Sequence, residues 1–257
     1  MRTRSSLRFA LLPVIAAVVL SVGCENKVTL PTPPEQTQGY DVYFGPLDPG
    51  GRSLYLVTLD QAATTQVMLA GVVLDNPFRS VDQALTVSFG GFDGSQCTDL
   101  DSVETTPRFT AVLQRYLPAG THCVAVADKS GRLTETVGVV LRVVAPTILQ
   151  TNASPGTDVF ASVITPAGRA TRSVEASTPG TINVTLTSLS SNVSAGLGLG
   201  IPATDGSGCQ LAKVVTATPG SSPQLSVQVD AGFYCMALYD IGNFTTVQNF
   251  SVTIAHP

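Results

Sequence analysis

The segment Asp93-Gly94-Ser95-Gln96-Cys97 recurs 112 residues later as Asp205-Gly206-Ser207-Gly208-Cys209. A second segment, Ala119-Gly120-Thr121-His122-Cys123, recurs at the same offset as Ala231-Gly232-Phe233-Tyr234-Cys235. Self-similarity at a fixed offset is typical of a duplicated unit, so we predict two copies of one domain. The cysteines are 26 residues apart in both copies. This predicts one disulfide per copy, Cys97 with Cys123 and Cys209 with Cys235, and the alternative is four free thiols.

The two copies also align at their starts, but at a different offset. Asp41-Val42-Tyr43 matches Asp158-Val159-Phe160, 117 residues later. We therefore expect a first domain over residues 41–146, a polar linker over 147–157 and a second domain over 158–257. Because each copy has its own strands, turns and cysteine pair, we expect the two domains to fold separately.

The change of offset from 117 to 112 predicts five extra residues in the first copy. They lie around Leu74 to Gln83. Asn76-Pro77 is a turn signal, so the insertion is expected in a loop.

Hydrophobic residues alternate with polar ones in each copy. Leu85, Val87 and Phe89 follow this period of two, which is typical of strands with one buried face. With many short strands and Gly-rich turns, the sequence predicts an all-β fold of two tandem antiparallel β-sandwiches, jelly-roll or immunoglobulin-like. In the strand after Gly120 the bulkier set, which includes Val124, is expected to face the core. Cys123 then lies on the outer face, so its disulfide would clip the turn after Asp93-Gly94 across the sheet.

The N-terminus resembles a bacterial lipoprotein signal. Arg2, Arg4 and Arg8 precede the apolar run Phe9 to Leu20. Leu20-Ser21-Val22-Gly23-Cys24 resembles a lipobox, with Ser21 at a place where Leu is usual. The resemblance implies a signal peptide over residues 1–23, diacylglycerol on the Cys24 sulfur and a palmitate-type acyl chain on its amine. The alternative is ordinary signal cleavage that leaves Cys24 as a free thiol.

Lipidation would account for the odd number of cysteines, five in all. We expect a lipid-anchored protein of the bacterial cell envelope, at the outer membrane and facing the periplasm or the surface. Residues 24–40 contain Leu30-Pro31-Thr32-Pro33-Pro34 and are expected to be an extended tether.

A second resemblance lies in the last third of each copy. Asp230-Ala231-Gly232-Phe233-Tyr234-Cys235-Met236-Ala237-Leu238, a turn, and Phe250-Ser251-Val252-Thr253-Ile254 resemble bacterial pre-peptidase C-terminal domains. Pro118-Ala119-Gly120-Thr121-His122-Cys123-Val124-Ala125-Val126 resembles the same pattern. The resemblance implies a β-sandwich without catalytic residues, of a kind appended to secreted hydrolases. The cysteine pairs and the lack of an attached catalytic domain depart from that family.

Candidate chemistry is sparse. Formal net charge is −4 and no basic stripe occurs, which excludes nucleic acid as a partner. The histidines are His122, at a half-buried strand position, and His256, expected to be too near the chain end to be held rigidly. No G-x-S-x-G nucleophile elbow accompanies them. We therefore expect no catalytic residue and no cofactor.

The acidic residues Asp93, Asp99, Asp101 and Glu104 could hold Ca²⁺, but a solvated acidic loop is the favoured interpretation. Together the sequence predicts a non-catalytic binding or scaffolding lipoprotein whose ligand is a protein or glycan. The alternative is an accessory subunit or inhibitor of a secreted hydrolase, and an enzyme in its own right is the third hypothesis.

Overall fold

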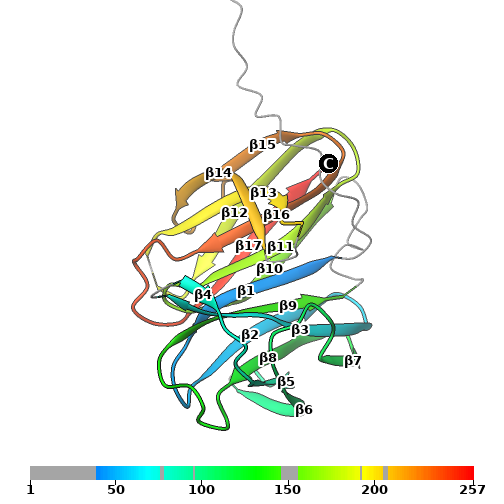
Figure 1. The fold of residues 1–257 in the computed structure, drawn as a ribbon. Coiled ribbons are helices and arrows are strands. Elements are labelled where there is room, and N and C mark those ends of the chain that lie inside the picture. The colour runs from blue at the N-terminus through cyan, green and yellow to red at the C-terminus, as the bar shows by residue number, and fades with distance from the viewer. Residues whose placement is uncertain (1–38, 76–77, 95, 146–155, 192, 205–207) are drawn as a thin grey trace, which may run out of the picture.

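The computed structural model describes residues 39–75, 78–94, 96–145, 156–191, 193–204 and 208–257. Their regular elements are all strands (Figure 1). Repeat one contains β1 (Tyr40–Leu47), β2 (Arg52–Leu59), β3 (Ala63–Asp75), β4 (Phe78–Ser80), β5 (Leu85–Phe92), β6 (Cys97–Thr105), β7 (Leu113–Leu117), β8 (Gly120–Ala127) and β9 (Val137–Val144). Repeat two contains β10 (Gly156–Ile164), β11 (Arg169–Ala176), β12 (Gly180–Leu189), β13 (Ala195–Pro202), β14 (Cys209–Ala217), β15 (Leu225–Val229), β16 (Gly232–Tyr239) and β17 (Gln248–His256). The prediction of an all-β fold is confirmed.

Each repeat is a sandwich of two antiparallel sheets with the same strand order. In repeat one the orders are β7-β3-β9-β1 and β2-β8-β5-β6, and β4 is an addition at the end of β3. In repeat two they are β15-β12-β17-β10 and β11-β16-β13-β14. Every strand of repeat two therefore has one counterpart in repeat one.

The two repeats share a sheet. β1 of repeat one pairs antiparallel with β11 of repeat two, with Asp41 opposite Arg172. This joins the two halves into one nine-stranded sheet. On the other layer β2 lies beside β10, and the Ser162 hydroxyl contacts both the N–H and the carbonyl of Leu56, at 3.0 and 2.8 Å. β1 thus meets the counterpart of β2, and β2 meets the counterpart of β1, as in an isologous dimer.

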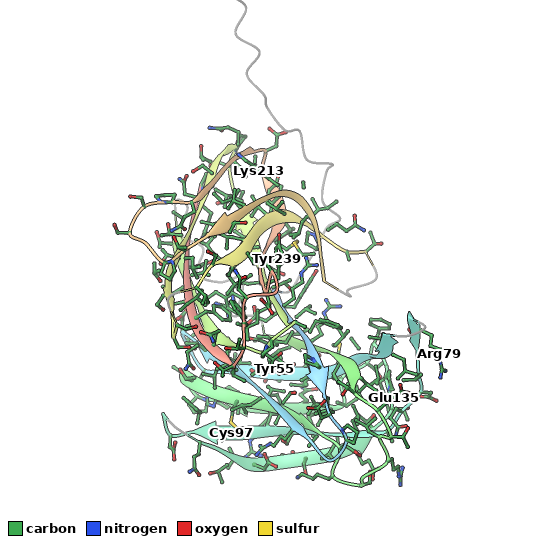
Figure 2. The ribbon with its side chains drawn as sticks, turned by 90° about the vertical axis from the view of Figure 1, so that its left-hand side faces the viewer. Tyr55, Arg79, Cys97, Glu135, Lys213 and Tyr239 are labelled. Carbon is green, nitrogen blue, oxygen red and sulfur yellow. A yellow bond between two sulfur atoms is a disulfide. The ribbon has the colours of Figure 1, made fainter. Side chains whose placement is uncertain are left out.

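One hydrophobic core runs through both repeats. At the junction Tyr43 stacks on Tyr55, with 4.8 Å between ring centroids, and lies 6.4 Å from Phe160. Phe160 in turn meets the edge of Phe250 at 5.1 Å. Figure 2 shows Tyr55 where the upper and lower halves of the molecule meet. The structure argues against the expectation that the repeats fold separately, because buried residues of both belong to one continuous cluster.

The extra residues of repeat one form a hairpin. β4 pairs back on the end of β3, with Val73 opposite Ser80, and the turn at Asn76-Pro77 lies outside the described residues. Thr86 and Gly196 occupy equivalent places, opposite Ala127 and Tyr239. The offset therefore falls from 117 to 110 before rising to 112 at the cysteines. Repeat one carries seven extra residues before β5, and repeat two carries two extra between β13 and β14, so the predicted five were a net value.

Both disulfides are present and lie within one layer. Cys97 of β6 and Cys123 of β8 are bonded across β5, with 6.0 Å between their Cα atoms. Cys209 of β14 and Cys235 of β16 are bonded across β13 in the same way, at 5.8 Å. The predicted pairing and the clip across the sheet are confirmed. On the loop-entropy model each is worth about 3.5 kcal/mol.

The two disulfides indicate an oxidising, extracytoplasmic compartment. In the part of the chain that the structure describes, no helix has the length and apolar character needed to cross a membrane.

Isolated repeat two should be much less stable than the same repeat in the whole chain. Residues 158–257 alone would expose the edge of β11 and leave Arg172 without Asp41. Denaturant unfolding under oxidising conditions should show a lower midpoint for the isolated repeat, or self-association through the exposed edge. A cooperative monomeric unfolding transition at the midpoint of the whole chain would contradict the shared core.

Candidate functional site

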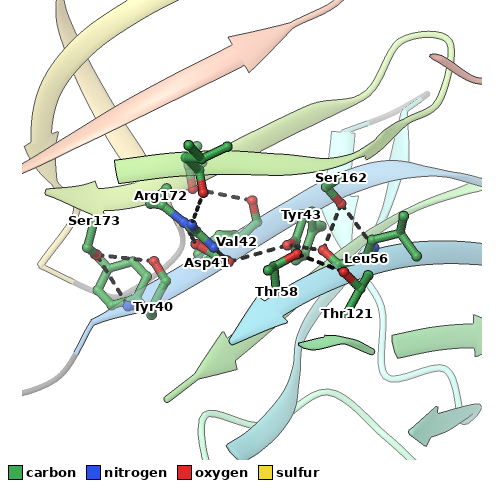
Figure 3. A network of polar contacts seen from close by, with 12 residues as sticks. Tyr40, Asp41, Val42, Tyr43, Leu56, Thr58, Thr121, Ser162, Arg172 and Ser173 are labelled. Carbon is green, nitrogen blue, oxygen red and sulfur yellow. Dashed lines mark hydrogen bonds and ion pairs between the residues drawn. The ribbon is translucent and has the colours of Figure 1, made fainter. Parts of the chain in front are cut away.

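A buried ion pair holds the repeats together. Arg172 Nε donates to Asp41 Oδ1 at 2.9 Å, and Nη2 donates to Oδ2 at 2.7 Å (Figure 3). The Asp41 side chain is 0% exposed and that of Arg172 is 8% exposed. Arg172 Nη1 donates to the Val159 carbonyl at 2.9 Å, and the guanidinium lies 4.5 Å from the Phe160 ring centroid. The guanidinium is thus bound on three sides and on one face, as a buried charge requires.

The electrostatics of this cluster favour one protonation state. Burial lowers the pKa of Arg172, but the charge and hydrogen bonds of Asp41 outweigh it and raise that pKa above its ordinary value. Burial, followed by the charge of Asp41, raises the pKa of Tyr43 well above its ordinary value. Tyr43 is therefore a neutral donor, and its hydroxyl donates to the Leu56 carbonyl at 2.8 Å.

His256 is held within repeat two, close to Asp158. It is the last residue of β17, its side chain is 2% exposed, and Nε2 lies 3.5 Å from Asp158 Oδ2. The expectation that His256 is loosely held was wrong, because pairing of β17 with β10 extends to the chain end and puts His256 opposite Gly156. His122 is also buried, and its Nε2 lies 2.7 Å from the Pro118 carbonyl. Its counterpart Tyr234 contacts the equivalent carbonyl, that of Asp230, at 2.9 Å.

A groove of about 420 Å³ lies on the outer face of the shared sheet, where the repeats join. Repeat one contributes Val42, Phe44 and Val140, and repeat two contributes Arg169, Leu211 and Tyr239. These residues alternate along β1, β9 and β11 with core residues such as Tyr43, Leu141 and Ala170. The groove is therefore on the side of the sheet opposite the core. It is the candidate binding site, because ligand sites are concave, largely apolar and often at domain junctions.

Arg169 is the cation of this groove. Its Nη2 donates to the Cys209 carbonyl at 2.5 Å, while its buried Nε has no hydrogen-bond partner. Burial lowers the pKa of Arg169, and Tyr239 partly offsets this. Among the described residues Arg169 forms no ion pair.

A carboxylate in each repeat ties a loop to the turn before the second strand. Asp128 accepts hydrogen bonds from the backbone N–H of Gly50, Arg132 and Leu133, at 2.9 to 3.1 Å. Its counterpart Asp240 accepts from Ala167, Gly242, Asn243 and Phe244 at 2.8 to 3.1 Å. Burial raises the pKa of each carboxyl, but the hydrogen bonds from these N–H groups outweigh burial and lower that pKa below its ordinary value.

The acidic residues expected in a loop lie largely in a strand, because Asp99, Asp101 and Glu104 belong to β6, and they have separate partners. Asp99 lies 2.5 Å from Arg52 and 3.2 Å from Lys129, and Glu104 lies 3.2 Å from Arg132. Asp93 accepts from the Gln96 N–H at 2.7 Å, and Asp101 follows Asp99 in β6. Within the described ranges no three His, Cys, Asp or Glu side chains are grouped as a metal site requires. The geometry therefore gives Asp99 and Glu104 cationic side chains as partners.

Sequence reasoning missed Asp41, Arg172, Asp128 and Asp240. Three of them are acidic residues whose counterpart in the other repeat is also acidic. Asp41 aligns with Asp158 at the offset of 117, and Asp128 aligns with Asp240 at the offset of 112. Retention of a carboxylate in both copies was the available signal. Arg172 gave none, because its counterpart in repeat one is Tyr55.

The comparisons with known proteins leave the family open. No protein-family model matches the chain, and no curated protein matches its sequence. Among solved structures, 72 chains match. They include the CUB1-EGF-CUB2 domain of human MASP-1/3, with 8% identity, 83% of this chain and 99% of that chain covered, and a TM-score of 0.24. The structure of Sulfolobus turreted icosahedral virus matches with 12% identity, 90% of this chain and 97% of that chain covered, and a TM-score of 0.23. Vicilin from hazelnut (Corylus avellana) matches with 7% identity, 84% of this chain and 74% of that chain covered, and a TM-score of 0.20. At these TM-scores none carries an argument about fold or function.

Removing one partner of the buried ion pair should destabilise the protein strongly. Arg172→Met leaves Asp41 buried and uncompensated, and we expect a loss of about 3–5 kcal/mol in the free energy of unfolding. The double variant Asp41→Leu/Arg172→Met should recover much of that loss, because an apolar pair needs no compensation. Chemical denaturation of the three proteins measures both effects. Additive losses in the double variant would show that the two side chains act independently.

The Asp128 carboxylate should contribute to stability at neutral pH and lose that contribution in acid. Because its pKa is lower in the folded state, the contribution is complete above the unfolded value of about 3.9 and disappears as pH falls through the lower folded value. Asp128→Asn should cost about 1–3 kcal/mol at pH 7 and reduce the loss of stability below pH 4. The control is Asp60→Asn at an exposed position. Equal effects of the two variants at pH 7 would contradict the role of Asp128.

Proposed function

We propose that this protein is a lipid-anchored binding protein of the bacterial cell envelope, without catalytic activity of its own. The observation that carries the binding role is the groove of about 420 Å³ built jointly by both repeats. The Gly23-Cys24 junction after an apolar run supports lipidation at Cys24. The two disulfides agree with export.

The lining of the groove is that of a binding surface. Phe44, Val140 and Leu211 supply apolar area, while Arg169 and Tyr239 supply polar ends. Such a combination gives affinity through apolar burial and orientation through a few polar groups. Neither His122 nor His256 lines the groove. The resemblance to pre-peptidase C-terminal domains supports the same non-catalytic role.

The tether would give the sandwich reach from the membrane. Residues 25–38 are rich in proline, and an extended chain of this kind covers about 3.1 Å per residue. The proposed anchor and the first strand would then be separated by up to about 40 Å. Three acyl chains at Cys24 would anchor stably, since each buried CH₂ contributes about 0.8 kcal/mol.

Cys24→Ala should abolish lipidation. We expect the wild-type protein in the membrane fraction with a mass that shows acyl chains and an N-terminus at Cys24, because thioether-linked lipid needs that sulfur. The alanine variant should lack acyl mass. Ser21→Leu, which supplies the usual lipobox residue, is the matched control and should be lipidated fully. Intact-mass analysis of membrane and soluble fractions decides, and a wild-type soluble product beginning elsewhere would refute the anchor.

A further inference from the structure

An aromatic ring lies over a glycine on each side of the groove. On the side of repeat one, a Cβ atom at Gly138 would lie 2.8 Å from Cε2 of Phe44. On the side of repeat two, a Cβ atom at Gly196 would overlap the ring of Tyr239. Non-bonded carbons approach to about 3.5 Å, so each ring needs the glycine beneath it. Figure 2 shows Tyr239 in the upper half of the molecule.

This construction makes the two walls of the groove flat and apolar. Phe44 and Tyr239 are both half-buried, and Val42, Val140 and Leu211 add aliphatic side chains. The rest of the lining is Ala167, Gly168, Thr171 and Gly208, with the charged residues Arg169 and Asp240. This mainly apolar lining suits a hydrocarbon body, because apolar side chains give the polar groups of a sugar or a peptide backbone no hydrogen-bond partner. The volume of about 420 Å³ is at the small end of the range for ligand pockets.

Two charged residues line the groove, Asp240 and Arg169, and they differ in how far their charged groups are already hydrogen-bonded. Both oxygens of Asp240 already accept hydrogen bonds, one from Ala167 and the other from three consecutive backbone N–H groups. Arg169 is the converse case. Its guanidinium forms no ion pair among the described residues, and its Nε lacks an acceptor. A guanidinium in an apolar wall favours an anionic ligand, because charge-assisted hydrogen bonds are strong where water is excluded.

We propose that the groove binds a small amphiphile, with its hydrocarbon body between Phe44 and Tyr239 and an acidic head group at Arg169. This ligand class rests on the binding role proposed above and narrows it. It differs from the protein or glycan expected from sequence, because the lining is mainly aliphatic and aromatic and its cation, Arg169, forms no ion pair among the described residues.

Calorimetric titration with decanoate tests the ligand class. The chain purified without its first 24 residues retains every residue that the structure describes. Decanoate should bind to it at least about tenfold more tightly than decan-1-ol, as one charge-assisted contact predicts, and decyltrimethylammonium should not bind. Equal affinities for decanoate and decan-1-ol, or no binding of decanoate, would overturn the proposal.

Variants locate the site. Arg169→Met should remove the preference for decanoate over the alcohol, while Phe44→Ala should weaken both. The matched controls are Arg115→Met on β7 and Phe109→Ala, a phenylalanine 57% exposed outside the groove, and both should bind like the wild type. If Arg169→Met does not fold, Leu211→Glu at the edge strand β14 should repel decanoate more than decan-1-ol. Unchanged affinity in the folded groove variants would place the ligand elsewhere and overturn the proposal.

These measurements are independent of Cys24. Loss of the amphiphile site would leave the lipid anchor and the general binding role open to their own test. A wild-type protein without acyl chains would refute the anchor while leaving decanoate affinity as the measure of this site.

Discussion

The ion pair between Asp41 and Arg172 determines how the two halves are arranged, because neither repeat contains both partners. A lone charge in this interior would cost several kcal/mol, so either side chain is tolerable only when β1 and β11 are paired. The pair also sets the register. A slip of β1 by one residue would turn Asp41 to the outer face, away from Arg172, and remove Tyr43 from the core. Its contribution is therefore one of specificity as much as of stability.

Duplication gave the two repeats equivalent edge strands, and sequence divergence made the two contacts between them different. These two seams are β1 with β11 and β2 with β10. At one seam β1 and β11 form a regular ladder. At the other, the Ser162 hydroxyl bonds to both backbone groups of Leu56 and replaces ladder hydrogen bonds with a side chain. The position equivalent to Arg172 is Tyr55, which packs on Tyr43 within the core. The groove thus lies over the regular seam, on the outer face of a pseudo-symmetric arrangement.

Much of each repeat could be predicted from local spacing, and the junction could not. Cysteine separation and period-two alternation report contacts within one copy, so the disulfides and the core-facing Val124 followed directly. Pairing of β1 with β11 leaves no periodicity in the sequence. The polar linker between the copies also favoured two independent domains. The groove residues Phe44, Arg169 and Tyr239 are single residues spread over three strands, and only the fold brings them together.

Disulfides stabilise the outer edges of the sheets, and non-covalent contacts stabilise the inner edges, where the repeats meet. One disulfide links the outer edge strand β6 to β8 across β5, and the other links the outer edge strand β14 to β16 across β13. The inner edges β1 and β11 have no such link and depend on the ion pair and the shared core. A ligand in the groove touches both inner edges and binds only the joined form, so it stabilises that form by mass action. The junction between β1 and β11, which neither disulfide links, is therefore the region that a bound ligand would stabilise.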